Sequence, residues 1–543
     1  MDGRLNHLIP RAQGSNEGLG DNHSKMAAPF IKRFFQSLPS SRFLGTVRDL
    51  NCSTKHQLNP AETGRRSPKT AFFLGFGLAG LLGFSGILYG KKQRKTSRIE
   101  ASFVEKKSEE KENNSPLQIS TKSEENIYDH SSWTIQSAIE ESRYIIKCMK
   151  EEIGCPGVCI AVSLDGKTVW SEGFGFADVE NRVLCTSKTV MRIASISKPI
   201  TATAVAKLWE EGKLDLDAPI QKYVTSFPEK SFRGSPVTLT TRHLLSHLGG
   251  IRHYQKPTTS SEENKTEKEK KVTVSGGCTC RQQGDSQFEE FHSKDHYKSV
   301  SEAIAMFKDD PLLSSPGASY LYTTHGWTLL SAVVESISGQ DFLLYMKKLF
   351  KDLGMENTRA EFNDTIILNR ARFYQRNCKG RLMNAPYVDN SYKWAGGGFL
   401  STVKDLIQFG NSLLYAKQIG EVDRKEASGM AGYLPGFLKP HTVTELWKIV
   451  ANTEGQGDRD GGYGLGWEVI AEKQEFGCCS HQSECVFHDG AAVGASSILM
   501  IRPQQAHTKP PKGVVIAILV NLQGVNLQKT AVAVAQCFER TQQ

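Results

Sequence analysis

From residue 131 onward the chain shows the regular spacing of apolar residues that a folded domain needs. Up to residue 153 these positions recur at a helical period, and Ser131 or Ser132 precedes them as a cap. We therefore predict a helix with one buried face. Its apolar positions are Ile135, Ala138, Ile139, Ile146, Met149 and Ile153.

Apolar runs at both ends of this region predict strands. VCIAVSLDGKTVWSEGFG, which begins at Val158, divides into two strands joined at Asp165-Gly166, a dipeptide typical of tight hairpin turns. Residues 496–503 (SSILMIRP) and 513–522 (GVVIAILVNL) predict two more strands, and residues 526–540 predict a helix with one apolar face. The sequence between the two ends is mainly helical in its spacing.

These elements predict an α/β (α+β) domain over residues 131–543. Its first and last strands would form one antiparallel sheet, with helices on both faces. A charged stretch at about 255–297, which contains SSEENKTEKEKK, interrupts the domain. Because this composition cannot build a core, we predict a surface insertion, with partner binding as an alternative role.

Composition changes the picture for the N-terminal region. Residues 26–48 hold four basic residues and no acidic one, among serines and apolar residues. This composition is typical of a mitochondrial targeting peptide. We predict a mitochondrial targeting region over residues 1–70; an ordinary disordered tail is the alternative.

Residues 71–90 (AFFLGFGLAGLLGFSGILYG) form an uncharged apolar run with basic residues on both sides. A helix of this length spans about 30 Å, the thickness of the hydrocarbon core of a bilayer. We predict a transmembrane or sorting segment, which would give association with the mitochondrial inner membrane; a buried core helix is the alternative. Residues 91–130 are rich in charge and predict a solvated linker.

Charge and cysteine content exclude several classes of protein. The net charge is +9, and residues 1–130 carry most of it, with 20 Lys/Arg against 13 Asp/Glu. The domain is therefore nearly neutral, which argues against nucleic acid as a partner. The 12 cysteines include no pair of C-x-x-C units, and CCSHQSEC (478–485) matches no common zinc module. We expect mainly reduced thiols, no metal and no cofactor.

The main chemical signal is RIASISKPITATAVAKLW, which begins at Arg192 and places Ser195 and Lys198 one turn apart at the start of an apolar helix. A serine hydroxyl is a weak nucleophile, and a partly desolvated lysine with a lowered pKa can accept its proton. The spacing alone is weak evidence, because Ser108 and Lys111 repeat it inside a charged run. A serine cap beside a solvated lysine is the alternative.

Two further motifs strengthen this signal. PGASYLYTTHGWTLL places Tyr322 just before an apolar helix, and VFHDGAAVGASSILMIRP places His488-Asp489-Gly490 just before a strand. Singly, Tyr322 would more simply be a packed aromatic residue and His488 a loop histidine. In this order, and with TTRHLLSHLGGI, AGGGFLSTVKDLIQFG and YGLGW, the motifs resemble those of the serine β-lactamase and penicillin-binding-protein family. The similarity is to its class C branch and covers about residues 133–540.

The resemblance implies a β-lactamase/transpeptidase-like fold, with an all-helical region beside the sheet. Ser195 would be the acylated nucleophile, Lys198 its proton partner and Tyr322 a second acid/base. His488 would stand where the family often has lysine, and would orient the substrate and Tyr322. The resemblance also implies an oxyanion hole made by the backbone N–H groups of Ser195 and Ala491, and substrate contacts from Thr324, Asp489 and Gly490.

Two positions depart from the family pattern. Thr324 replaces an asparagine, which removes an amide donor, and His488 carries no fixed charge near neutral pH. Both changes argue against antibiotic hydrolysis as the physiological task.

Together with the targeting region, the motifs are most similar to a mitochondrial branch of the family in animals. This similarity implies a peptidase that acts on peptide or protein substrates in the intermembrane space and influences mitochondrial lipid metabolism. It also implies a homo-oligomer that can form filaments. The alternatives are an esterase, and a self-assembling filament scaffold in which catalysis is secondary or lost.

Overall fold

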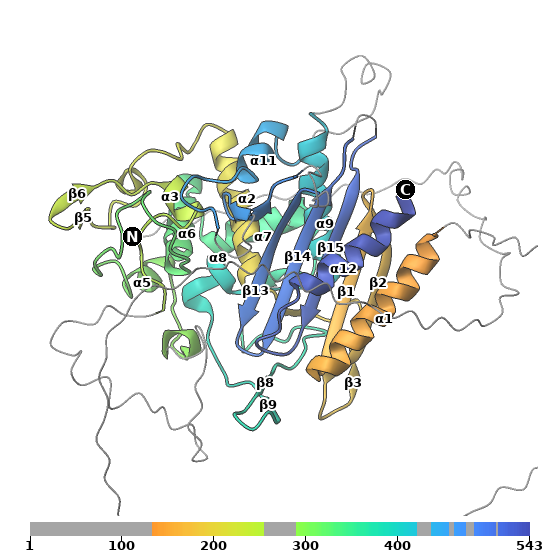
Figure 1. Cartoon of the computed structure of the whole chain (residues 1–543). Helices are drawn as coiled ribbons and strands as arrows, with labels where there is room; N and C mark the ends of the chain where they lie inside the picture. Colours follow the sequence, from red (N-terminus) through yellow and green to blue (C-terminus); the bar gives the residue numbers. More distant parts are fainter. Residues whose placement is uncertain are drawn as a thin grey trace, which may run out of the picture. The chain divides into compact units, whose positions relative to one another are not determined.

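An antiparallel sheet, in which the first and last strands of the domain lie side by side, forms the centre of the fold (Figure 1). A computed structural model gives this arrangement and describes residues 133–254, 289–420, 436–455, 461–473, 483–506 and 509–542. The described residues do not include the predicted targeting region (1–70), the apolar segment (71–90) or the linker (91–130). They also do not include residues 255–288, which make up most of the predicted insertion. Within the described part, no helix has both the length and the apolar character to cross a bilayer.

The sheet has the strand order β11-β12-β13-β14-β15-β1-β2-β3 in the described part of the chain. The C-terminal strand β15 pairs with β1, so Val158 lies opposite Val520, and the predicted antiparallel sheet is confirmed. The strands are β1 (Gly157–Leu164), β2 (Lys167–Asp178), β3 (Val183–Leu184), β11 (Gly461–Tyr463), β12 (Glu468–Ile470), β13 (Cys485–Ala492), β14 (Ala495–Pro503) and β15 (Gly513–Val520).

The turn between β1 and β2 is the predicted hairpin. Asp165 and Gly166 have φ angles of 49° and 75°, in the left-handed region that a two-residue turn of this kind requires. Aspartate tolerates this region better than most residues and glycine adopts it freely, which explains why this dipeptide ends the strand.

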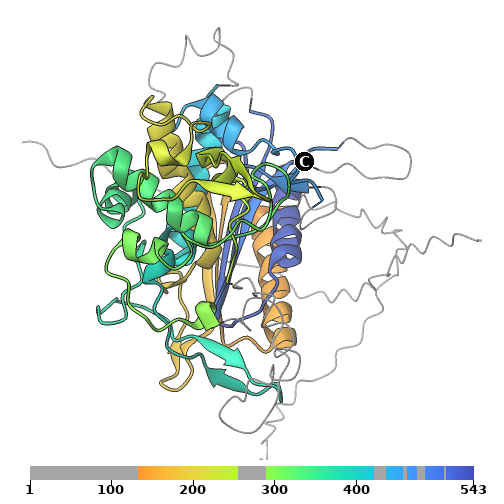
Figure 2. The same cartoon turned by 90° about the vertical axis from the view of Figure 1, so that its left-hand side faces the viewer.

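Each strand places alternate residues on opposite faces, and two apolar cores result. On β1, Val158, Ile160 and Val162 belong to the core beneath α1 (Ile135–Ile153) and α12 (Gln528–Glu539). Cys159 and Ala161 face the larger core on the other side. Figure 1 shows α1 and α12 together across one face, and Figure 2 shows the remaining helices on the opposite side of the sheet.

The helical layer over the larger core carries most of the middle of the sequence, as predicted. Its helices are α2 (Ser197–Glu210), α3 (Thr241–Leu245), α5 (Val300–Ile304), α6 (His325–Ser338), α7 (Phe342–Asp352), α8 (Trp394–Gly397), α9 (Val403–Gln418) and α11 (Pro440–Leu446). Short strands accompany these helices. One small sheet consists of β4 (Met191–Arg192), β10 (Phe399–Ser401) and β7 (Arg359–Ala360). Two hairpins consist of β5 (Lys230–Phe232) with β6 (Ser235–Val237), and of β8 (Tyr374–Arg376) with β9 (Leu382–Asn384).

One local expectation was wrong and one was incomplete. The cap of α1 is Thr134, whose hydroxyl accepts a hydrogen bond from the Ser137 N–H, because a cap must directly precede the first helical residue. The His488-Asp489-Gly490 motif lies inside a strand, β13, and not merely before one. The alternation of apolar and polar residues that predicts a strand is not evident in its sequence, CVFHDGAA, because polar residues and a glycine interrupt it.

Leu519 gives a direct test of the larger core. Its side chain is fully buried, whereas Leu344 on α7 is 57% exposed. Leu519→Ala should lower the free energy of unfolding by about 2–5 kcal/mol, because it leaves a cavity in a packed interior. Leu344→Ala should change it by about 0.5 kcal/mol or less. Urea unfolding of the two variants measures the difference, and similar values for both would contradict this packing.

Candidate active site

Ser195 lies on η1 (Ala194–Ile196), a single 3₁₀ turn between β4 and α2. Its side chain is partly exposed, while Ala194 and Ile196 on either side are buried. Ala194 has a φ angle of +48°, a strained value for a residue with a Cβ atom. Its contacts with Ala492 and Ala495 from the β13–β14 hairpin hold this conformation and present the serine at the surface of the layer.

Lys198 lies one turn further on, in the first turn of α2, and its side chain is fully buried. Its Nζ donates to Ser195 Oγ at 3.0 Å and to the carbonyl oxygen of Gly396 at 2.7 Å. Gly396 belongs to α8, within the AGGG run of the sequence. The amine is thus fixed between the serine hydroxyl and a backbone carbonyl from a distant segment.

Tyr322 reaches the same oxygen from a third segment, just before α6. Its phenol donates to Ser195 Oγ at 2.8 Å, and Lys198 Nζ lies 4.7 Å from the centre of its ring. Burial raises the pKa of Tyr322 well above its usual range, and the hydrogen bond to Ser195 only partly opposes this shift. The phenol is therefore protonated at neutral pH and acts as a donor in the resting site.

His488 lies on β13, close to this group but not in direct hydrogen bond with it. The centres of its ring and the Tyr322 ring are 6.5 Å apart. His488 Nδ1 lies 2.6 Å from the carbonyl oxygen of Asp489, which places the proton on Nδ1, and Nε2 then accepts from the Tyr463 hydroxyl at 3.0 Å. Burial, followed by the charge of Lys198, lowers the pKa of His488 to about 3. The imidazole is neutral at physiological pH.

The predicted oxyanion and substrate residues occupy three different environments. β13 passes so close to η1 that a Cβ atom at Gly490 would lie 2.5 Å from the carbonyl oxygen of Ile193, so only glycine fits there. Ala491, the next residue, is exposed. Thr324 is buried, and its hydroxyl pairs with the Tyr254 hydroxyl at 3.4 Å. Asp489 is half-buried, and burial raises its pKa to about 6.

Sequence reasoning missed several residues around this site. His247 accepts a hydrogen bond from the Thr323 N–H, and its ring lies 4.3 Å from that of Tyr322. Tyr463, which the YGLGW motif already contained, donates its hydroxyl to His488 Nε2 and contacts the ring of His247. The Gly396 carbonyl was beyond sequence reasoning, because a backbone acceptor leaves no trace in residue type.

The described residues contain no group of three or more His, Cys, Asp or Glu side chains suited to a metal ion. His247 and His253 each accept a hydrogen bond from a backbone N–H, those of Thr323 and Thr324 respectively. Among the described cysteines, Cys378 is disulfide-bonded, and the free ones are Cys148, Cys155, Cys159, Cys185, Cys485 and Cys537. Residues 478–482 of the CCSHQSEC stretch lie outside the described residues, whereas Cys485 is described and is buried as a free thiol.

Known proteins share this sequence and architecture. The profile of the family described as Beta-lactamase matches residues 143–536. Serine beta-lactamase-like protein LACTB, mitochondrial, of Mus musculus is 45% identical over 447 residues, which cover 74% of this chain and 80% of the relative. The Homo sapiens protein of that name is 45% identical over 441 residues, with the same coverage.

Two solved structures share the fold. EstCE1, a hydrolase with promiscuous acyltransferase activity, has a TM-score of 0.56 at 18% identity, covering 74% of this chain and 98% of that one. The octameric penicillin-binding protein homologue from Pyrococcus abyssi has a TM-score of 0.53 at 24% identity, covering 74% of this chain and 77% of that one. These likenesses support the β-lactamase/transpeptidase-like fold predicted from sequence.

The neutral His488 makes stability depend on pH. Below about pH 6.5 the unfolded histidine takes up a proton that the folded one, with a pKa of about 3, does not, so the free energy of unfolding falls as the pH drops. At pH 4 this group should cost about 3 kcal/mol relative to pH 7. His488→Gln should remove that share, as measured by urea unfolding across this range. His441→Gln, at an exposed histidine, is the control; identical slopes for all three proteins would contradict the expectation.

Proposed function

Because the chain belongs to the beta-lactamase family of serine hydrolases, we propose that it cleaves amide or ester bonds through an acyl-enzyme formed on Ser195. The observation that carries this proposal is the convergence of the Lys198 amine and the Tyr322 phenol on Ser195 Oγ, at 3.0 and 2.8 Å. Two side chains, one from the next turn and one from a distant segment, meet at one partly exposed hydroxyl, which is the arrangement that an activated serine requires.

In this proposal Ser195 Oγ attacks the carbonyl carbon of the substrate, and Lys198, in its neutral form, accepts the serine proton. The hydrogen bonds of Lys198 Nζ to Ser195 Oγ and to the Gly396 carbonyl hold the amine in place for this transfer. The backbone N–H groups of Ser195 and Ala491 stabilise the negative charge on the substrate oxygen, the largest single contribution in hydrolases of this kind. Tyr322, protonated in the resting site, gives its proton to the leaving group, and water then releases the acyl group by the reverse path.

The electrostatics of β13 limit the substrate class. His488 is neutral and bonded to Tyr463 and Asp489, so it offers no fixed positive charge to a substrate carboxylate. The hydroxyl of Thr324 is already paired with Tyr254. We therefore favour internal peptide bonds of peptide or protein substrates over β-lactams or terminal residues. An esterase remains the alternative, since the same three side chains serve either bond.

The cellular setting is a further part of the proposal. The mouse and human relatives bear the word mitochondrial in their names, which supports a mitochondrial location together with the composition of residues 26–48. Within the mitochondrion we propose the intermembrane space, with proteolysis there influencing lipid metabolism. Residues 71–90 would provide inner-membrane association.

A second candidate function is self-assembly, as a homo-oligomer or filament scaffold. Exposed apolar side chains gather on the segment between residues 362 and 387, where Ile366 is 89% and Leu368 is 79% exposed. Such surfaces commonly mark protein–protein contacts. The penicillin-binding protein homologue from Pyrococcus abyssi, which shares the fold, is octameric, and this supports the proposal that the present chain can also assemble. Hydrolysis and assembly need not exclude each other, because these residues differ from those around Ser195.

A fluorophosphonate probe tests the nucleophile. We expect labelling of the wild type and of Ser108→Ala, and none of Ser195→Ala, because Ser195 Oγ meets Lys198 and Tyr322. Tyr322→Phe should lower hydrolysis of an alkyl ester or peptide by about 100-fold, the usual contribution of a general acid. Labelling that persists in Ser195→Ala would refute the proposal.

The assembly hypothesis has its own test. Ile366→Glu combined with Leu368→Glu should shift the protein toward monomers, because two buried charges per contact oppose association. Light scattering after gel filtration measures the mass, and hydrolysis per subunit should stay within about twofold. Leu344→Glu is the control for an exposed leucine outside the segment. An unchanged mass would place the interface elsewhere.

A further inference from the structure

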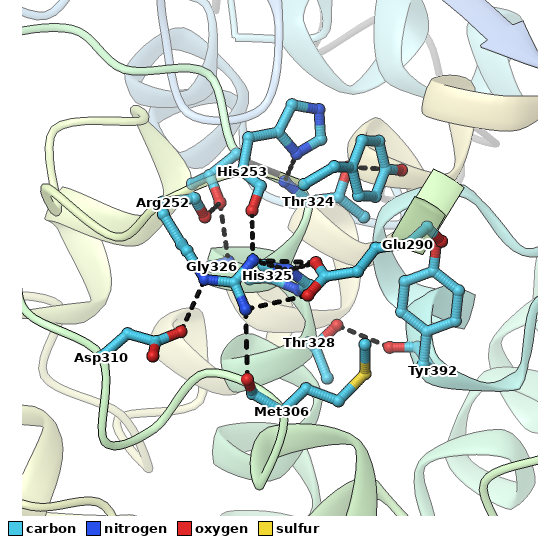
Figure 3. Close-up of polar contacts among 12 residues, drawn as sticks. Arg252, His253, Glu290, Met306, Asp310, Thr324, His325, Gly326, Thr328 and Tyr392 are labelled. Atoms are coloured by element: carbon cyan, nitrogen blue, oxygen red, sulfur yellow. Dashed lines mark hydrogen bonds and ion pairs between the residues drawn. The ribbon is translucent and has the colours of Figure 1, made fainter. Parts of the chain in front are cut away.

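A largely buried cluster of charged side chains lies around the start of α6, just after Tyr322 in the chain (Figure 3). We call it the Arg252 cluster; its members are Arg252, Glu290, Asp310 and His325. The Arg252 guanidinium is fully buried, and all five of its N–H donors have acceptors. These acceptors are both carboxylate oxygens of Glu290 (2.8 and 3.0 Å), Oδ2 of Asp310 (2.5 Å) and the carbonyl oxygens of His253 (2.7 Å) and Met306 (3.1 Å).

His325 completes the cluster. Its Nε2 lies 2.9 Å from Glu290 Oε2 and 3.1 Å from Arg252 Nη1. Since the two N–H groups of Nη1 already have the His253 carbonyl and Glu290 Oε2 as acceptors, we assign the proton to Nε2, which donates to the carboxylate. Burial opposes ionisation of Glu290, but hydrogen bonds from His325 and Arg252 lower its pKa to about 2. Burial also lowers the pKa of His325 to about 4, although Glu290 counters part of that shift. Near neutral pH the cluster therefore holds a charged Arg252–Glu290 pair beside a neutral imidazole.

The three residues that follow Tyr322 are each bonded to this cluster or to its flanking residue. Thr323 Oγ1 donates to the Arg252 carbonyl oxygen at 2.6 Å, and the Thr324 N–H donates to His253 Nδ1 at 3.2 Å. His325 is itself a member and is the first residue of α6. The backbone that carries the phenol is thus tied, residue by residue, to the position of Arg252.

We propose that the Arg252–Glu290 pair is a positioning device that sets the Tyr322 phenol against Ser195. Both residues are positioning residues, because neither touches Ser195. A shift of about 1 Å in a reacting group can cost about 100-fold in rate, so a rigid support for the phenol matters to the chemistry. The inference rests on the proposed function, and deepens it by naming what holds the general acid.

Glu290 gives this inference an unexpected consequence for the charged insertion predicted at 255–297. Arg252 precedes that stretch, and Glu290 lies near its C-terminal end, on η4 (Glu289–His292). The Tyr392 hydroxyl also donates to the backbone carbonyl of Glu290 at 2.7 Å, which ties η4 to the segment just before α8. The last residues of the predicted insertion therefore belong to the support of the active site.

The test compares two esters of one acyl group, an alkyl ester and a nitrophenyl ester. A nitrophenolate leaves without protonation, whereas an alkoxide needs the proton of Tyr322. Glu290→Gln, which keeps the shape and removes the charge, should lower kcat for the alkyl ester by about tenfold or more and for the nitrophenyl ester by about threefold or less. The KM values should change by about twofold at most, since the substitution alters neither Ser195 nor the proposed substrate-contacting residues.

Glu539→Gln is the matched control, because it breaks the Arg502–Glu539 pair between β14 and α12, away from this cluster. It should leave the ratio of the two esters unchanged. If Glu290→Gln does not fold, Thr323→Val removes the bond to the Arg252 carbonyl without altering any charge and should change the ratio in the same direction. An unchanged ratio in the folded variant overturns the inference. Activity that survives Ser195→Ala would instead refute the proposed function.

Discussion

One oxygen atom, Ser195 Oγ, organises the site, because it receives hydrogen bonds from both the Lys198 amine and the Tyr322 phenol. Each partner is constrained by a further contact: the buried Lys198 by the Gly396 carbonyl, and the half-buried Tyr322 by the bonds of the residues that follow it. A buried polar group without partners is costly, so these contacts fix the geometry before any substrate arrives. The strained backbone at Ala194 belongs to the same constraint, since packing on the β13–β14 hairpin holds it.

The surroundings of this oxygen are polar but carry little charge. His247 and His488 are both fully buried, and burial keeps each imidazole neutral. Tyr463 joins them through ring contacts and through its hydrogen bond to His488. Fixed dipoles of such neutral groups can stabilise the charge that develops during a reaction, because they need little reorganisation. This is the physical basis for preferring an internal peptide bond or an ester.

The layer beneath the site has the opposite character, since the Arg252 cluster concentrates full charges there. Replacing such a pair by apolar residues often costs nothing in stability, so its presence is better explained by the geometry it fixes than by the energy it adds. Directional bonds from Arg252 and Glu290 define the start of α6 in a way that apolar contacts cannot. Hydrogen bonds thus connect the Arg252 cluster, through the residues that follow Tyr322, to the hydroxyl of Ser195.

The sequence by itself determined the sheet of first and last strands, the Asp165-Gly166 turn, and the identity of Ser195, Lys198, Tyr322 and His488 as candidates. It could do so because periodicity, turn residues and ordered motifs are local properties of the chain. Tertiary structure alone decided that Tyr463 bonds to His488, that Gly396 holds Lys198, and that Glu290 bonds to Arg252 and His325. Those relations join residues far apart along the chain, often through backbone atoms, and no local pattern records which segments the folded core will bring together.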